Sequence, residues 1–346
     1  MIRYAGIRLL HLVPLLFVLS LLCFGLLEAA PGDAASAQLA ARSVLSPTPE
    51  QLAQARHNLG LDQPLPLRYA SWLSRVCHGD LGFSTATGTP VRTELADALP
   101  WTLLLVGAAL LVTTVLALLL GVSLGTARGR AGRLWPALVH GVTLLLGAAP
   151  AFVVALLGVW LLALTLGWLP SGGVASPGSD PTVPEVARHL VLPTLTLACS
   201  HHLGIFTRLI ENGMLQARAD QHVLTARALG LGERTVVRQH VLRVGLVPFV
   251  ARVGSTCGAL VGGSYVVEII FGWPGMGRLT LEAAQGYDAP TLCGVVLLSG
   301  AVVLAVNLLA DVAVAWLAPQ SRPERTAARR APRTSGKGGA RLVHGR

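Results

Sequence analysis

Charged residues are scarce in this chain. They make up 13% of its 346 residues, about half of their share in an ordinary soluble domain. Aromatic residues add only 5%, so the 53% hydrophobic content is mainly leucine, valine and alanine. This apolar share is too large for one soluble core and is typical of a polytopic membrane protein.

Motifs for catalysis and metal binding are also missing. The sequence contains no HExxH, no CxxC and no GxxxxGK[ST], and its only lysine, Lys337, lies in the stretch "SGKGG". We therefore expect no catalytic residue, no metal site and no ATP hydrolysis by this chain itself. Five cysteines are scattered singly, which favours small hydrophobic packing residues over a zinc site or a disulfide scaffold: Cys23, Cys77, Cys199, Cys257 and Cys293.

Long apolar runs are abundant. A membrane-spanning helix needs about 20 mostly apolar residues, and six segments qualify, covering roughly residues 9–27, 102–124, 134–166, 190–206, 244–271 and 292–317. The first segment has an alternative interpretation as a signal peptide, because small residues follow it. Its apolar run of about 19 residues exceeds the usual core of about 7–15, which favours a retained helix.

Positive charge is distributed unevenly around these segments. The connections that would lie on one side of the membrane, with both termini, carry 19 lysines and arginines, and the opposite connections carry seven. Because cytoplasmic loops carry the excess of positive charge, we expect both termini in the cytoplasm. We divide the chain into a first helix and outer-face cap at 1–100, a membrane core at 101–319, and a basic disordered tail at 320–346.

The basic tail has two interpretations. A basic segment can bind nucleic acid, but this one follows a long apolar body. That position favours anionic membrane lipid as its partner, and we expect no nucleic acid.

The outer cap carries a helix-start signal in "SPTPEQLAQARHNLG". Thr48 and Gln51 have the spacing of a capping box, in which each side chain bonds the other's backbone N–H. We expect a small helical cap on the outer face.

The stretch "LTARALGLGERTVVRQHVLRVGLVP" predicts a short helical elbow. One helix should end near Leu229, because Gly230 suits the left-handed position that follows a helix. A second should begin at Glu233, with Val237 and Val241 on one face. Helices this short are unstable alone in water, so the elbow either docks on a partner or lies on anionic headgroups.

Several motifs in order along the chain resemble those of inner-membrane permeases of ABC importers in the dipeptide, oligopeptide and nickel branch. They are "PGD" at 31–33, "LGLDQPLPLRYASWL" at 59–73, "GDLGFS" at 79–84, "FGWPGMG" at 271–277 and "NLLAD" at 307–311. The elbow resembles that family's EAA loop, about 211–248, in these residues: Thr225, Ala226, Arg227, Ala228, Gly230, His240, Leu242 and Arg243.

The resemblance implies an all-α fold with six transmembrane helices, the type I ABC importer permease fold, in a bacterial inner membrane. It implies that the elbow, with Glu233 at its second helix, is a coupling helix seated in a cleft of a separate ATPase. Two ATPase subunits, which would bind ATP and Mg²⁺, a second homologous permease and an extracytoplasmic substrate-binding protein are the implied partners. We expect Ala226 to let the elbow approach the ATPase and Gly230 to set its turn.

The fifth apolar segment holds candidates for a pathway or gate. Arg252 is a charge inside an apolar run, which marks a functional residue facing the interior unless its side chain snorkels to the surface. Gly254, Gly258 and Gly262 recur every four residues, which favours close helix packing and leaves a pathway lining open. Glu268 sits near the outer end, where it faces the pathway or a solvated helix end.

Four polar residues elsewhere favour helix contacts. His201 and His202 suggest nickel, but adjacent helical residues point about 100° apart, which favours a polar contact between helices. Asn307 and Asp311 share a face of the sixth segment, which favours a helix or subunit contact over substrate binding.

The substrate stays open between peptides and nickel. The spacing from "PGD" to "SPTPEQ" and the stretch "FSTATGTPV" are somewhat closer to nickel-type members. Two other classes are a membrane enzyme and a membrane anchor or assembly factor. The first would need facing catalytic groups within the spans, and the second would not need an ATPase-docking elbow.

Overall fold

The computed structural model describes residues 2–29, 35, 39, 48–58, 62–127, 131–176, 178 and 180–317, with side chains left out at 2–13, 131–133, 201, 251, 254–255 and 310–317. Within these ranges the chain is helical, and the one strand-like pairing is an isolated bridge between Phe83 and Pro90. The basic tail at 320–346 lies outside the described residues.

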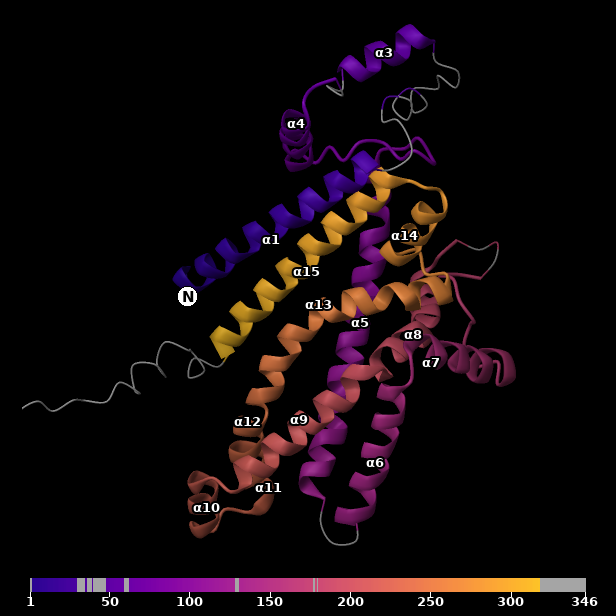
Figure 1. The fold of residues 1–346 in the computed structure, drawn as a ribbon. Helices are drawn as coiled ribbons and strands as arrows, with labels where there is room; N and C mark the ends of the chain where they lie inside the picture. Colours follow the sequence, from indigo (N-terminus) through magenta and orange to yellow (C-terminus); the bar gives the residue numbers. More distant parts are fainter. Residues whose placement is uncertain are drawn as a thin grey trace, which may run out of the picture.

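Most of the apolar segments form long helices (Figure 1). The elements before residue 180 are α1 (Ile2–Ala29), α3 (Pro49–Asn58), α4 (Leu65–Cys77), α5 (Val91–Thr126), α6 (Ala131–Ala148), α7 (Ala151–Gly158) and the π-helix η1 (Val159–Thr165). Those after it are α8 (Val183–Cys199), α9 (His201–Arg218), α10 (Gln221–Ala228), α11 (Glu233–Thr235), the π-helix η2 (Val236–Val241), α12 (Leu242–Gly245), α13 (Val247–Phe271), α14 (Met276–Gln285) and α15 (Ala289–Leu317).

Two helices, α5 and α15, are long and apolar enough in the described residues to cross a membrane singly, and up to five spans result if each bent helix pair is one span. The apolar segment at 134–166 is divided between two helices. Here α6 and α7 meet at 106°, because Pro150, the residue before α7, has no N–H to continue α6. A second bend, of 58°, separates α8 from α9.

The core forms where α9 packs along α5. Two glycines on α5 make this approach possible, since a Cβ on Gly121 would lie 2.7 Å from Ile210 and one on Gly125 would lie 2.9 Å from the Met214 sulfur. Ile210 and Met214 are fully buried in this contact. The α5–α9 pair therefore forms the rigid centre from which the shorter elements extend.

The first and last helices of the chain also pack against each other. Figure 1 shows α1 running antiparallel beside α15, with the start of α1 and the end of α15 on the same side. A Cβ on Gly300 of α15 would lie 2.6 Å from a methyl group of Leu19 on α1. The retained-helix interpretation of residues 9–27 agrees with this packing.

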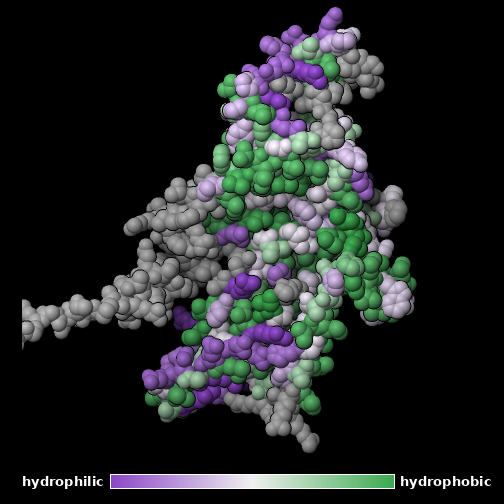
Figure 2. All heavy atoms as spheres, viewed as in Figure 1, coloured by the Kyte–Doolittle hydropathy of each residue, from purple (hydrophilic) through white to green (hydrophobic). Residues whose placement is uncertain are grey.

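Polar side chains gather at the two ends of the molecule. Figure 2 shows hydrophilic residues over α3 and α4 at one end and over the α10–α12 region at the other, with hydrophobic residues between them. Exposed leucines lie on the intervening helices, among them Leu111 and Leu119 on α5. This distribution is what a membrane-embedded body requires.

The capping box at the start of α3 is confirmed. The Thr48 N–H donates to Gln51 Oε1 at 2.9 Å, and the Gln51 N–H donates to Thr48 Oγ1 at 3.3 Å.

Candidate functional site

The elbow between α9 and α13 is closed by a Schellman turn at the end of α10. The Leu231 N–H donates to the Ala226 carbonyl at 3.2 Å, and the Gly230 N–H donates to the Arg227 carbonyl at 3.0 Å. Gly230 has φ +79°, a left-handed conformation that glycine adopts without the steric cost of a Cβ. The predicted helix end and the predicted role of Gly230 in the turn are both confirmed.

An ion pair braces the same turn. Arg227 Nε donates to Glu233 Oε2 at 3.2 Å, and its Nη2 donates to Oε1 at 3.0 Å. Glu233 begins α11 as predicted. The two side chains are 35% and 39% exposed, so the pair adds only about 0–1 kcal/mol to stability. Its effect is to fix the angle between the two arms of the elbow.

The predicted face of the second arm is confirmed and is wider than expected. Val241 is fully buried, and Val237 packs against the same apolar cluster. Val236 is also fully buried there, because the π-helix η2 brings residues five apart onto one face.

Ala226 also differs from its expected role. Its side chain is 4% exposed and belongs to one apolar cluster with Val223, Val236 and Val241. It therefore faces the elbow's own interior, where only a small side chain fits between the two arms, and the expectation that Ala226 contacts an ATPase directly does not agree with this burial.

The elbow is anchored to the membrane helices by a backbone contact between Gly213 on α9 and Gly245 on α12. A Cβ built on Gly245 would lie 2.9 Å from the carbonyl carbon of Gly213, and one built on Gly213 would collide with the Gly245 carbonyl oxygen. Only glycine at both positions permits this crossing. This crossing holds the elbow against α9, and α13 begins two residues after Gly245.

The tip of the elbow carries an exposed apolar surface. Leu224, Leu229 and Leu231 are 53%, 77% and 42% exposed. We call these three side chains the leucine tip.

The other predicted elbow residues are divided between the surface and the interior. Thr225 and Ala228 are exposed on α10, and Arg243 is exposed on α12. His240 is half-buried, with its ring centroid 6.2 Å from that of His222. Leu242 packs against the apolar cluster of the elbow.

At the opposite end, Glu268 on α13 is fully buried. Its carboxylate accepts hydrogen bonds from Ser264 Oγ at 3.0 Å and from the Gly277 N–H at 2.6 Å, and Thr102 also bonds it. The interpretation as a solvated helix end is therefore wrong. Gly275 of "FGWPGMG" makes room for this carboxylate. A Cβ at this position would lie 2.6 Å from the Glu268 carboxyl carbon and 2.6 Å from Thr102 Oγ1.

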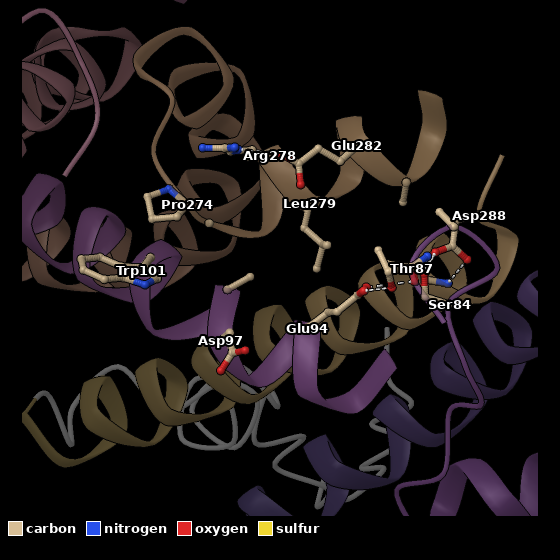
Figure 3. A pocket seen from close by; sticks show the side chains of 15 residues that line it. Ser84, Thr87, Glu94, Asp97, Trp101, Pro274, Arg278, Leu279, Glu282 and Asp288 are labelled. Atoms are coloured by element: carbon tan, nitrogen blue, oxygen red, sulfur yellow. Dashed lines mark hydrogen bonds and ion pairs between the residues drawn. The ribbon is translucent and has the colours of Figure 1, made fainter. Parts of the chain in front are cut away.

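A cavity of about 430 Å³ opens beside this network (Figure 3). Trp101 and Pro274 lie at one end of it, and Ser84, Thr87 and Asp288 lie at the other (Figure 3). Its lining also holds three further carboxylates and one arginine: Glu94, Asp97, Glu282 and Arg278. Arg278 Nε donates to Glu282 Oε1 at 2.7 Å. The cavity is thus lined by both apolar and acidic side chains.

Asp288 ties the loop before α5 to the start of α15. Ser84 Oγ donates to one carboxylate oxygen, and the backbone N–H groups of Thr85 and Thr291 donate to the other at 3.1 and 3.3 Å. Burial raises the pKa of Asp288, but the hydrogen bonds from Ser84, Thr291 and Thr85 outweigh it and hold the pKa below its usual value. The ionised form is therefore the one that the fold stabilises.

The three α13 glycines do not share one environment. A Cβ on Gly258 would lie 2.8 Å from Val303 and 3.1 Å from the Asn307 amide on α15, which confirms close packing there. Gly262 has nothing within 4 Å in the described residues, and the surroundings of Gly254 lie outside them. Arg252 is exposed in the second turn of α13, and its role in a pathway stays a prediction.

The remaining polar candidates are placed in part. His202 lies in the first turn of α9, with its ring centroid 6.3 Å from that of Phe206 on the same helix. Asn307 lies at the α13–α15 contact, in agreement with a helix-contact role. The side chains of His201 and Asp311 lie outside the described residues.

Sequence reasoning missed the residues that hold these sites together. Gly213 and Gly245 are 32 residues apart, and no local pattern pairs them. Some partners of Glu268 and Asp288 also come from distant positions, since Ser84 and Asp288 are 204 residues apart.

Comparison with known proteins identifies the family. The model described as "Binding-protein-dependent transport system inner membrane component" matches residues 117–323, and the model of the N-terminal part of these membrane components matches residues 1–106.

Named relatives cover nearly the whole chain. A putative peptide permease protein of Brucella ovis is 37% identical over 322 residues, which are 92% of this chain and 99% of that protein. The oligopeptide transport system permease protein AppB of Bacillus subtilis is 33% identical, with 92% and 99% covered. The glutathione transport system permease protein GsiC of Salmonella choleraesuis is also 33% identical, with 93% and 99% covered.

A solved structure shares the fold. A chain in a crystal structure of the MetNI methionine ABC transporter, in an inward facing conformation, superposes with a TM-score of 0.52 at 20% identity, covering 64% of this chain and 95% of that chain. This likeness concerns the fold alone. Together with the family models and the full-length relatives, it establishes that the chain belongs to the family of inner-membrane permease components of binding-protein-dependent transport systems.

Proposed function

We propose that this chain forms one half of the membrane pathway of an ATP-driven peptide importer and receives the force of a separate ATPase through the elbow. Six transmembrane helices, with both termini in the cytoplasm, place the elbow on the cytoplasmic face and α3, α4 and α14 on the outer face. The positive charge around the elbow, from Arg234, Arg238 and Arg243, supports this orientation.

The observation that carries the proposal is an exposed apolar tip on a rigidly anchored elbow. Leu229 is the most exposed of the three tip leucines, and a leucine so exposed among charged residues gains free energy when a partner covers it. The backbone crossing of Gly213 and Gly245 connects the same elbow to α9 and α13. A partner that docks at the leucine tip and moves would therefore move α9 and α13 with it.

A partner permease completes the pathway. Gly262 on α13 has open space around it in the described residues, and a smooth helix face supports close approach by another helix. Two ATPase subunits, holding ATP and Mg²⁺, would then engage one elbow from each permease. The domain division at about residue 100 assigns the outer cap to reception of the substrate-binding protein.

Peptides are the proposed substrate class. The relatives named above carry peptide, oligopeptide and glutathione in their names, which favours peptides over the nickel interpretation of the outer loop. Measuring which compounds the cognate binding protein retains identifies the substrate.

The experiment that tests the proposal compares two elbow variants for co-purification of the ATPase. Leu229→Asp places a charge on the leucine tip, while Arg234→Ala removes a charge from an exposed neighbour and serves as the matched control. We expect Leu229→Asp to lose most of the ATPase and Arg234→Ala to keep it. If Arg234→Ala loses the ATPase and Leu229→Asp keeps it, charge holds the ATPase and docking through the leucine tip is wrong. If both variants keep the ATPase, the elbow is not its docking site.

A further inference from the structure

Cys23 and Cys293 are 270 residues apart in the sequence and meet where α1 lies along α15. Cys293 Sγ lies 3.3 Å from the Cys23 carbonyl oxygen, and Cys23 Sγ lies 4.0 Å from the Cys293 carbonyl oxygen. The two thiols also contact each other. The two thiols are free in the structure, and this reciprocal arrangement places them face to face across the α1–α15 contact.

Both cysteines lie close to the same end of their helices. Cys23 precedes the end of α1 at Ala29 by six residues, and Cys293 follows the start of α15 at Ala289 by four. At a rise of about 1.5 Å per residue, each lies within about 10 Å of the helix end. In the proposed orientation these ends face the outside of the cell, the compartment in which disulfides form and persist.

We propose that Cys23 and Cys293 form a disulfide that fastens the first helix to the last. The oxidant is a disulfide of the outer compartment, on a protein or a small thiol compound. One cysteine thiolate attacks it, forming a mixed disulfide and releasing the first thiol. The second cysteine thiolate then attacks the cysteine sulfur of the mixed disulfide and releases the second thiol. The two protons from the cysteines end on the two released thiols, so the cysteine pair is oxidised by two electrons and the oxidant is reduced by two.

The burial of the pair sets the order of events. Cys23 is 1% exposed and Cys293 is 4% exposed, so the oxidant reaches them before α1 has packed on α15. Once formed, the bond is shielded from water-soluble reductants. The described contacts of α1 are mainly with α15 and α4. The disulfide therefore fastens α1 to the helix on which it packs most.

The test measures the thiol state of the whole chain in its native membrane. Cells are quenched with acid, the protein is denatured and alkylated with N-ethylmaleimide, and its mass is measured with and without prior reduction. We expect the chain, which has five cysteines, to take up three labels without reductant and five after it. Proteolysis should yield one cross-linked peptide pair holding Cys23 and Cys293.

Matched variants make the assignment specific. Cys23→Ser and Cys293→Ser each leave every remaining cysteine open to alkylation without reductant, whereas Cys257→Ser keeps the cross-linked pair. Full alkylation of the unreduced wild-type chain, or a bond through exposed Cys77, overturns the proposal. The disulfide rests on the membrane orientation given under the proposed function. Labelling of a cysteine introduced in the tail tests that orientation separately, so a wrong orientation can be distinguished from an absent disulfide.

Discussion

Replacing Gly213 by alanine perturbs the connection between the elbow and the membrane helices and leaves the leucine tip untouched. The new Cβ collides with the carbonyl oxygen of Gly245, which lies well inside 3.0 Å, the closest approach that real Cβ atoms show. The obstructing atoms are backbone, so no rotamer change relieves the clash. The backbones of α9 and α12 must therefore separate by about 1 Å.

The cost follows from two opposing contributions. Overpacking a close contact costs about 1–3 kcal/mol, and the better helix propensity of alanine offsets up to about 1 kcal/mol of that. With the full offset the net penalty is about 0–2 kcal/mol, and about 1.4 kcal/mol changes an equilibrium tenfold. This is enough to move the elbow out of register with α9 without unfolding the chain.

The assay is ATP-dependent uptake into proteoliposomes that contain the chain, its partner permease, both ATPases and the binding protein. We expect Gly213→Ala to retain the ATPase and to lower the amount of substrate moved per ATP hydrolysed several-fold. Gly107→Ala is the matched control, because a Cβ there meets nothing within 4 Å. An unchanged transport-to-ATP ratio in Gly213→Ala would refute the reasoning that the glycine crossing transmits the motion.

Three further outcomes follow from the structure. Glu268→Ala leaves the buried N–H of Gly277 unpaired at a cost of about 1–3 kcal/mol, so it should lower the temperature of half-unfolding of the purified chain. A temperature of half-unfolding equal to that of the wild type contradicts the bracing role of Glu268. Because the folded-state pKa of Asp288 is lowered, its stabilisation is present above the unfolded pKa of about 4 and is lost as the pH falls through the folded value. The stability gap between wild type and Asp288→Asn should therefore stay constant above about pH 5 and shrink as the pH falls below about 4. A gap in thermal unfolding that does not shrink on acidification contradicts the assignment. A cysteine introduced at Ser335 should stay unlabelled by an impermeant reagent in intact cells, and labelling there would show that the tail lies outside.

The apolar helices and the elbow could be predicted from the sequence because their determinants are local. Long apolar runs specify helices wherever they pack, and Gly230 specifies a left-handed turn whatever surrounds it. The capping box of Thr48 and Gln51 is likewise complete within four residues. These features were predicted correctly for that reason.

The sequence left other features undetermined for different reasons. The bend at Pro150 divides one apolar run into two helices, and hydropathy alone does not show it. The π-helix adds Val236 to the buried face, which a period of 3.6 residues does not predict. Ala226 was expected to act at the ATPase although its own chain encloses it, because its packing partners lie on the other arm of the elbow.

The most direct test of the central claim is photo-cross-linking from the tip of the elbow. A benzophenone amino acid replaces Leu229 in the assembled complex, and another replaces Leu67 on α4, which is 57% exposed and lies at the opposite end of the molecule (Figure 1). Irradiation should link position 229 to the ATPase subunit and leave position 67 without that product. A cross-link from position 229 to lipid alone, with the ATPase present and active, would contradict the proposal that this elbow couples ATP hydrolysis to transport.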